Sequence, residues 1–381
     1  MSPMRGGIRL LFLPLALSPL LPFAVFRANR IAQGEPRSLV ETLGAGPAAL
    51  AVAALAGGIA ALAFARRPAW GAAIAAALIL GIVLAAGWGA SSLMAGVPTQ
   101  ARVSPGAGFW VALVAAALLL IDALARMRPR PALRLALVGF AVAAGALLLS
   151  SGALSQLSVM QEYRNRSAAF WREGASHLWL AFGSFAAAML AGVPLGIALT
   201  RRAGARGSVL GLLTMLQTIP SMALFGMLIV PLGWLAANLP AAHALGIRGI
   251  GAAPAFVALF LYSLLPIVAN TVAGITGVPR SVTEAADGMG LTRRQRLFHV
   301  DVPLALPVII TAARIVLVQN IGMATVGALI GAGGFGTFVF QGIGQTATDL
   351  ILLGALPTVA LASATSAVMD ALIGMLPGGA R

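Results

Sequence analysis

Cysteine is absent from the chain of 381 residues, and so is lysine, because all 25 basic residues are arginines. Without cysteine the chain can form no disulfide, no thiolate zinc site and no cysteine nucleophile. Without lysine it cannot carry a P-loop of the form G-x-x-x-x-G-K-[ST], whose lysine contacts the nucleotide phosphates. The chain therefore cannot itself be a P-loop ATPase. With only three histidines, far apart in the sequence, we expect neither a metal site nor a cofactor.

Charged residues are also scarce: they make up 9% of the chain, against 60% hydrophobic residues and a mean hydropathy of +0.96. A soluble domain carries roughly a quarter charged residues, so an ordinary soluble protein is excluded. The net charge of +15 is spread over short clusters of arginine between apolar runs. We read these clusters as a sign of membrane topology and expect no nucleic-acid partner.

Ten apolar runs are long enough to cross a lipid bilayer, which takes about 20 residues of helix. They fall at 8–26, 46–65, 69–89, 107–125, 132–152, 175–200, 207–235, 252–277, 303–330 and 350–375. Unpaired backbone groups are costly in lipid, so such runs must be helical, whereas a β-barrel would show short alternating segments instead. We predict an all-α integral membrane protein of about ten transmembrane helices.

The first run could also be a signal peptide, since Arg5 and Arg9 precede it. Its length, its three prolines and the lack of a small-x-small cleavage site before Arg27 favour a retained helix. With the N-terminus inside, sixteen arginines fall in inside loops and eight in outside loops. This excess favours cytoplasmic positions for both termini.

The chain divides into two parts of different character. Residues 1–152 hold five predicted spans joined by loops of little character, and we treat them as an N-terminal extension. The polar stretch 161–166 marks an extracytoplasmic connector over 153–174. The remaining five spans, over 175–376, carry the distinctive motifs, so we expect the functional core there.

The segment 279–302 is the only long charged loop predicted on the cytoplasmic side. Ser281 with Glu284, and Thr292 with Gln295, have the spacing of capping boxes. The loop should therefore fold as two short helices, hinged at the glycines between them.

The order of residues in this loop is similar to a known pattern. Glu284-Ala285-Ala286 is followed by Gly290 and then by Val300-x-Val302-Pro303. This resembles the EAA loop of binding-protein-dependent ABC import permeases, whose pattern ends in Ile-x-Leu-Pro. A lone S-x-x-E is more simply a helix cap, and it is the wider pattern that favours the permease.

The resemblance implies a transport subunit without a catalytic site, whose loop docks into a groove of a separate ATPase subunit. Small alanines would let the loop sit deep in that groove, while a glutamate and arginines would fix its orientation. The helix that follows the loop would carry the motion into the membrane. The residues implied in coupling are Glu284, Ala285, Ala286, Gly290, Arg293 and Pro303.

Three further segments, 216–224, 258–268 and 328–336, look like permeases for glycine betaine, choline and related quaternary amines. With its extra N-terminal helices, the chain is similar to the Yeh-type branch of that family. The resemblance implies a type I ABC importer core in the bacterial inner (cytoplasmic) membrane. Its partners would be ATPase subunits, a second permease copy or a related permease, and an extracytoplasmic substrate-binding protein. The exact solute stays open, and so does the choice between a homodimer and a heterodimer.

Pro220 interrupts the seventh run, and a proline in a membrane helix frees carbonyls that neighbours or a water-filled cavity must satisfy. Gln217, Thr218 and Ser221 flank it. Two roles are open for these side chains: repair of the backbone or bridging between helices, and lining of a translocation path. Asn270 belongs to the same neutral polar set, which would suit a compact zwitterion.

Arg314 lies eleven residues beyond Pro303, about 16 Å along a helix, and therefore near mid-membrane. A charge at that depth usually faces protein or water, so we include it among the candidate path residues, with no partner evident. Asp370, near the inner end of the last run, and Asp122, one turn before Arg126, are expected to be structural.

Four glycines follow the ninth run on the predicted outer side: Gly331, Gly333, Gly334 and Gly336. They could form an outer gate or merely turn the chain.

Two other classes of membrane protein fit less well. Proton-coupled carriers usually bury acidic residues or histidines at mid-depth, whereas the carboxylates here fall at span ends or in loops. A membrane hydrolase would need a nucleophile or metal motif, and neither G-x-S-x-G nor H-E-x-x-H occurs. An ABC permease for another small polar solute, such as an amino acid, is the main alternative.

Overall fold

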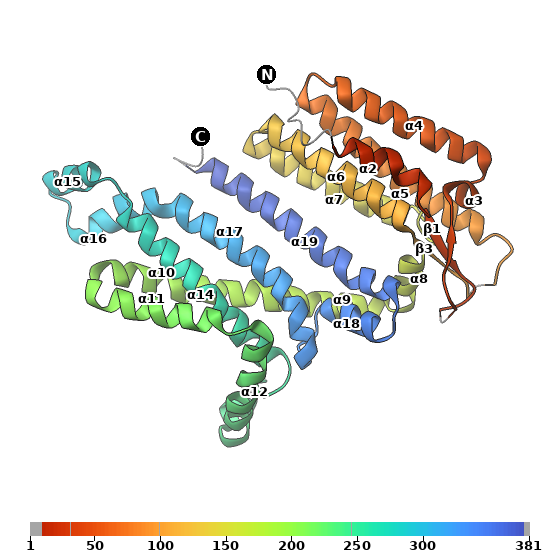
Figure 1. Cartoon of the computed structure of the whole chain (residues 1–381). Helices are drawn as coiled ribbons and strands as arrows, with labels where there is room; N and C mark the ends of the chain where they lie inside the picture. The colour runs from red at the N-terminus through yellow and green to blue at the C-terminus, as the bar shows by residue number, and fades with distance from the viewer. Residues whose placement is uncertain (1–9, 31, 99, 245, 377–381) are drawn as a thin grey trace. The chain divides into compact units, whose positions relative to one another are not determined.

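The computed structural model of the chain describes residues 10–30, 32–98, 100–244 and 246–376 (Figure 1). Within this range the chain forms two compact units, one of residues 10–129 with 139–165, the other of 130–138 with 166–376. Nine helices or continuous helical runs in the described residues are long and apolar enough to cross a membrane. The predicted class, an all-α integral membrane protein, is confirmed.

The first unit is built around three long helices, α4, α5 and α6. Its helices are α2 (Phe12–Leu17), α3 (Leu39–Leu43), α4 (Ala45–Phe64), α5 (Pro68–Leu93), α6 (Ala107–Met127), α7 (Pro131–Ser150, whose first turns belong to the second unit) and α8 (Ser158–Asn165). Alanines at the crossing of α5 and α6, among them Ala90 and Ala116, are fully buried and let the two backbones approach closely. On α6 the Arg126 guanidinium lies 2.7 Å from the Asp122 carboxylate, which confirms the structural pair expected there.

A small antiparallel sheet joins the ends of these helices, which the prediction did not include. Its strands are β1 (Ala24–Arg27), β2 (Glu35–Arg37) and β3 (Arg102–Pro105), in the order β2-β1-β3. Strands β1 and β2 precede the first spanning helix α4, and β3 lies between α5 and α6, so they do not change the all-α class of the membrane region.

The first predicted span, 8–26, is wrong in its described part. The helix α2 has six residues, a 3-10 turn η1 (Ser18–Leu20) follows, and β1 begins at Ala24. Pro19 lies in that turn and Pro22 follows it, and since each removes a helical hydrogen bond, these closely spaced prolines disfavour one continuous helix. A helix of six residues is only about 9 Å long, too short to cross a bilayer.

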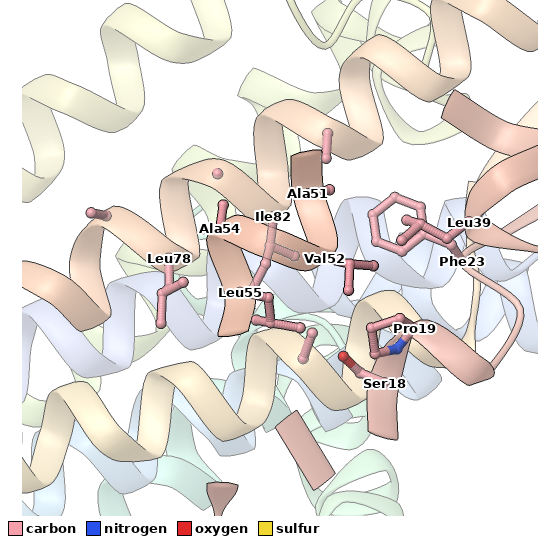
Figure 2. Close-up of a pocket in the computed structure, with 14 residues that line it drawn as sticks. Ser18, Pro19, Phe23, Leu39, Ala51, Val52, Ala54, Leu55, Leu78 and Ile82 are labelled. Atoms are coloured by element: carbon pink, nitrogen blue, oxygen red, sulfur yellow. The ribbon is translucent and has the colours of Figure 1, made fainter. Parts of the chain in front are cut away.

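Figure 2 shows an apolar cavity of about 160 Å³ in this unit, with Val52, Leu55, Leu78 and Ile82 among its lining side chains. Its one lining hydroxyl, on Ser18, already donates to the Leu15 carbonyl at 2.8 Å. Apart from that hydroxyl, the described side chains that line the cavity are apolar and do not suit a polar solute.

The second unit contains the other long helices. Its elements are α9 (Ser167–Leu178), the π-helical turn η2 (Trp179–Gly183), α10 (Ser184–Arg201), α11 (Ala203–Thr218), α12 (Ser221–Asn238), α13 (Pro240–Ala244), α14 (Ala252–Thr276), α15 (Arg280–Gly288), α16 (Arg293–Arg296), the π-helical turn η3 (Leu297–Asp301), α17 (Val302–Val326), the 3-10 turn η4 (Gly327–Ile330), α18 (Gly336–Gly344) and α19 (Thr348–Met375).

Helices α10, α14 and α17 form the centre of this unit, and α19 packs along α17 (Figure 1). Gly192 and Gly196 on α10 face α14, where a Cβ at Gly196 would come within 2.6 Å of the Thr271 Cβ. This small-xxx-small spacing lets the two helices touch along their backbones.

The seventh predicted span, 207–235, is divided into α11 and α12, which meet at Ile219–Pro220. Pro220 has no N–H for a helical bond, and Ile219, the residue before it, takes an extended conformation, as residues before proline prefer. The change of direction at this point is visible in Figure 1.

Candidate functional sites: the coupling loop and the helix break

The candidate coupling loop, residues 279–302 and called the coupling loop below, folds as two short helices, as predicted. The second begins with a capping box, in which the Thr292 hydroxyl accepts from the Gln295 N–H and the Gln295 side chain accepts from the Thr292 N–H. The first capping box is wrong. Helix α15 already begins at Arg280, with Pro279 as its N-cap, so Ser281 lies inside the helix and Glu284 is free to pair with Arg280.

Arg296 holds the two helices of the coupling loop together. Its guanidinium donates to the Asp287 carboxylate at 2.7 Å and lies 3.5 Å from the Asp301 carboxylate, at the start of the membrane helix. Ala286, next to Asp287 in the sequence, is buried at 2% exposure. The loop is therefore a folded unit before any partner binds.

The burial of Ala286 corrects part of the expected docking surface. This side chain packs inside the loop and cannot enter a groove of another protein, whereas Ala285 and Glu284 are exposed. The Arg280 Nε lies 3.0 Å from the Glu284 carboxylate, and Met289 is 74% exposed nearby in the sequence.

Gly290 ends the first helix in the left-handed region, with φ of +80°. A Cβ there would meet no atom within 4 Å, so the requirement for glycine comes from backbone conformation and not from space. Pro303 lies where the π-helical turn η3 passes into α17, inside the continuous helical run Arg293–Ile330, and its missing N–H removes one helical hydrogen bond there.

A cavity of about 820 Å³ separates the coupling loop from the ends of α10 and α14. Its lining includes Arg201, Thr276, Arg293 and Arg296. The loop therefore stands away from the helical core on this side and meets it chiefly through η3 and α17.

The break between α11 and α12 is tied to α14 by two reciprocal hydrogen bonds. The Gln217 side-chain amide donates to the Tyr262 carbonyl at 2.7 Å, and the Tyr262 hydroxyl donates to the Ile219 carbonyl. In a helix the Tyr262 carbonyl would accept from the N–H of residue 266, but that residue is Pro266. Gln217 thus supplies the donor that Pro266 cannot give to the Tyr262 carbonyl. The Tyr262 hydroxyl in turn binds the backbone at the break made by Pro220.

The other candidate path residues are only partly brought together. Thr218 and Pro220 are exposed at the break, and Ser221 is half-buried beside them. The Thr218 hydroxyl donates to the Met215 carbonyl, and the Asn270 amide to the Pro266 carbonyl of its own helix. Asn270 lies eight residues beyond Tyr262, roughly 12 Å further along α14.

Arg314 has a partner that the sequence did not reveal, because its guanidinium pairs with the Asp370 carboxylate across α17 and α19. Asp370 is therefore structural, in keeping with its expected role. Since side chains on a helix lean toward its N-terminus, the Arg314 head lies closer to the inner end than its Cα.

Three polar side chains that the sequence analysis missed meet in the centre of the second unit. The Asn320 amide of α17 donates to the hydroxyls of Ser184 on α10 and Ser263 on α14, at 3.1 and 2.9 Å, and all three residues are fully buried. In the sequence, the signal that could have revealed this cluster was an asparagine within an apolar run. The node fixes the register of the three central helices.

The glycine segment, residues 331–336, lies at the end of α17 opposite to the coupling loop. Gly331, Gly333 and Gly334 all have φ between +77° and +87°. The segment packs on α9, where Glu173 accepts from the Gly334 N–H at 2.9 Å and Ser176 donates to the Ala332 carbonyl at 3.0 Å. Sequence reasoning did not find Glu173, which lay in the predicted connector.

Both the N-terminal and the C-terminal part of the chain match known protein families. Residues 179–379 match the family described as "Binding-protein-dependent transport system inner membrane component", and residues 4–160 the one described as "ABC transporter permease YehY, N-terminal domain". The chain is 42% identical over 186 residues to the osmoprotectant import permease protein OsmW of Salmonella typhimurium, covering 49% of this chain and 81% of OsmW.

A second relative is the glycine betaine/carnitine/choline transport system permease protein OpuCB of Bacillus subtilis. It is 36% identical over 186 residues, which cover 49% of this chain and 78% of OpuCB. Among solved structures, a chain of the inward-facing MetNI methionine ABC transporter covers 54% of this chain and 95% of its own length, at 24% identity and a TM-score of 0.41.

Proposed function

Because the chain belongs to the family of binding-protein-dependent transport system inner membrane components, we propose that it is the permease subunit of an ATP-driven importer for quaternary-amine osmoprotectants. The structural observation that carries the proposal is the coupling loop. It is a charged loop between two membrane-spanning helices and is folded through contacts of its own. Its exposed face is formed by Arg280, Glu284 and Ala285.

The division of labour follows the boundaries expected from the sequence. We propose that residues 1–152 are an accessory extension, that 153–174 connect it on the outer side, and that 175–376 form the type I permease core. The stretch 153–174 consists mostly of α8 and the first turns of α9.

The coupling residues are proposed to act in two groups. Glu284, Ala285 and Arg293 are exposed and would contact the ATPase subunit. Ala286 and Gly290 would preserve the shape of the loop, and Pro303 would join it to α17. ATP-driven movement of the ATPase would shift the loop, and Arg296 would carry the shift to Asp301 at the start of the membrane helix.

The translocation path is proposed to run past the helix break. Thr218, Pro220 and Ser221 lie at the surface of the unit, so a second permease copy or a related permease would be needed to enclose the path. Gln217 and Asn270 would stand behind them, with their amides already engaged. Arg314, the remaining candidate path residue, would take part with its charge paired to Asp370.

The substrate class rests on the relatives. OsmW is an osmoprotectant import permease and OpuCB transports glycine betaine, carnitine and choline by name. A weakly polar path without a fixed charge suits such a solute. An extracytoplasmic binding protein would select it, for example through cation–π attraction in an aromatic cage. An ABC permease for another small polar solute, such as an amino acid, is the alternative.

The importer would lie in the bacterial inner membrane with the coupling loop and the C-terminal end of α19 facing the cytoplasm. The predicted cytoplasmic N-terminus needs a tenth crossing before α4, which α2 and β1 do not supply. That half of the prediction depends on residues 1–9, outside the described residues.

Uptake in reconstituted vesicles tests the function. The permease, its co-purified ATPase and the binding protein encoded with them are combined, and labelled glycine betaine, choline and an amino acid are offered with and without ATP. We expect ATP-dependent uptake of a quaternary amine that also requires the binding protein. Uptake driven by a proton gradient without ATP would overturn the importer, and ATP-dependent uptake of the amino acid alone would overturn only the substrate class.

A further inference from the structure

The glycine segment does not form a free loop, because one face of α9 holds it. Glu173, Ser176 and His177 recur at helical spacing, so they lie on the same side of that helix. One carboxylate oxygen of Glu173 accepts from both the Gly334 N–H at 2.9 Å and the Thr337 hydroxyl at 3.2 Å. Ser176 adds the bond to the Ala332 carbonyl one turn further along.

The glycines themselves are explained by this contact. A Cβ at Gly333 would lie 2.9 Å from the Glu173 carboxylate and 3.0 Å from the Ser176 hydroxyl, and one at Gly334 would lie 3.1 Å from the His177 ring. A larger residue at these positions would force the side chains of Glu173, Ser176 or His177 to shift, in addition to the strain of a positive φ. Glycine is therefore required in this segment for two reasons: the segment packs closely on α9, and its backbone has positive φ.

The hydrogen bonds that the Glu173 carboxylate accepts contribute strongly to holding the glycine segment. Its side chain is only 14% exposed, and an ionised carboxylate that loses water in this way depends on its donors. Gly334 is buried, so without Glu173 its N–H would lose the acceptor that the described residues provide. Separation of the segment from α9 is thus costly for both partners.

We propose that Glu173 is the positioning residue that holds the glycine segment on α9 until α17 moves. The inference rests on the proposed function, since α17 joins the coupling loop at one end to this segment at the other. Movement of α17 would draw the segment away from Glu173, so the Glu173 contact sets how easily the outer end of the unit opens. Glu173 contacts the gate and not the solute.

The natural absence of cysteine makes the segment easy to follow. Ala332, which is 5% exposed, is replaced by cysteine as the only thiol, and the rate of its modification by a maleimide is measured on the full chain in lipid vesicles. We expect Glu173→Ala to raise this rate about tenfold, because loss of a hydrogen bond to a charged group shifts an equilibrium by roughly that factor. Glu173→Gln, which keeps a neutral acceptor, should give a smaller rise.

Arg172→Gln is the matched control. Arg172 is the neighbour of Glu173 on the same helix, but it is 75% exposed and its charge lies 3.6 Å from the carboxylate, so its contribution is small. The labelling rate of the Arg172→Gln variant should equal that of the parent. If Glu173→Ala does not insert, Thr337→Val decides, because it removes one donor from a partly exposed position and should still raise the rate several-fold.

A second readout separates gating from a loss of fold. In the assembled complex, labelling of the parent should accelerate when ATP and the loaded binding protein are added, whereas the Glu173→Ala variant should label rapidly without them. Equal labelling of the parent and the Glu173 variants would overturn the inference. The maleimide-labelling assay needs no ATPase, binding protein or solute, so its result does not depend on transport. Failure of the parent to take up solute in the reconstituted importer would instead count against the proposed function.

Discussion

The hydrogen bond from Gln217 to the Tyr262 carbonyl allows a test in which one substitution should cancel another. Gln217→Leu removes the donor and leaves a carbonyl without a partner between membrane helices. A buried acceptor left in this way costs about 1–3 kcal/mol, whereas side-chain hydrogen bonds between membrane helices average about 0.6 kcal/mol and reach about 1.7 kcal/mol. We therefore expect Gln217→Leu to lower the free energy of unfolding by about 1–2 kcal/mol.

Pro266→Ala should remove most of this loss. An alanine at 266 has the N–H that the Tyr262 carbonyl would accept in an uninterrupted helix, so the Gln217 side chain becomes unnecessary. In the Pro266→Ala background the effect of Gln217→Leu should fall below about 0.5 kcal/mol, within the error of additivity.

The assay is equilibrium unfolding of the purified chain in mixed micelles, followed by circular dichroism for the four members of the cycle. Tyr262→Phe serves as the control, because it removes the reciprocal bond to Ile219 but leaves the Tyr262 carbonyl in place. Pro266→Ala should not rescue it. An equal loss from Gln217→Leu in both backgrounds, or none in the parent, would refute the reasoning.

Three further substitutions follow from the same structure. Gly290→Ala should cost about 1–2 kcal/mol by forcing a Cβ into the left-handed region and should reduce solute-stimulated ATP hydrolysis, whereas Gly288→Ala, at the end of α15 in open space without positive φ, should cost no stability and leave ATP hydrolysis unchanged. Arg314→Leu should destabilise the chain by about 3 kcal/mol in the unfolding assay. Adding Asp370→Leu should recover most of that, and a double variant no more stable than the single would argue against the pair. Asn320→Leu should cost about 1 kcal/mol, because both serines it contacts keep bonds to their own helices, and unchanged unfolding would remove the central node.

The spans could be predicted because apolar length alone decides them, and most predicted runs appear as helices. The two that differ contain prolines near their middle, where hydropathy stays high while the helical hydrogen bonds fail. Pro19 and Pro22 turn the first run into a short helix and a strand, and Pro220 bends the seventh. Hydropathy cannot report this, because proline among leucines hardly changes the average.

The coupling loop was predicted in outline because capping and glycine signals are local. Thr292 caps its helix as expected, but Pro279 takes the cap position in place of Ser281, so α15 starts two residues earlier than expected. Arg296 folds back across the loop to pair with Asp287, nine positions earlier, and the neighbouring Ala286 is buried. Such a contact is invisible to a pattern of spacings.

The residues that sequence reasoning missed all act at long range. Tyr262, Asn320 and Glu173 find their partners 43 or more positions away, on other helices or on the glycine segment. Arg314 was recognised as unusual from its depth, yet its partner Asp370 lies 56 positions away. A single sequence shows that a buried polar group needs a partner but not which one it has.

The most direct test of the central claim is the Glu284→Lys variant in the reconstituted importer. Within the described part of the chain, Glu284 pairs with Arg280 at an exposed surface, with side-chain exposures of 65% and 92%, so the pair contributes little to stability. The variant should insert and unfold like the parent, and any loss of transport must then come from the partner that the loop contacts. We predict that Glu284→Lys abolishes ATP-dependent uptake of labelled glycine betaine and weakens co-purification of the ATPase. Undiminished uptake by this variant would contradict the assignment of residues 279–302 as the coupling loop.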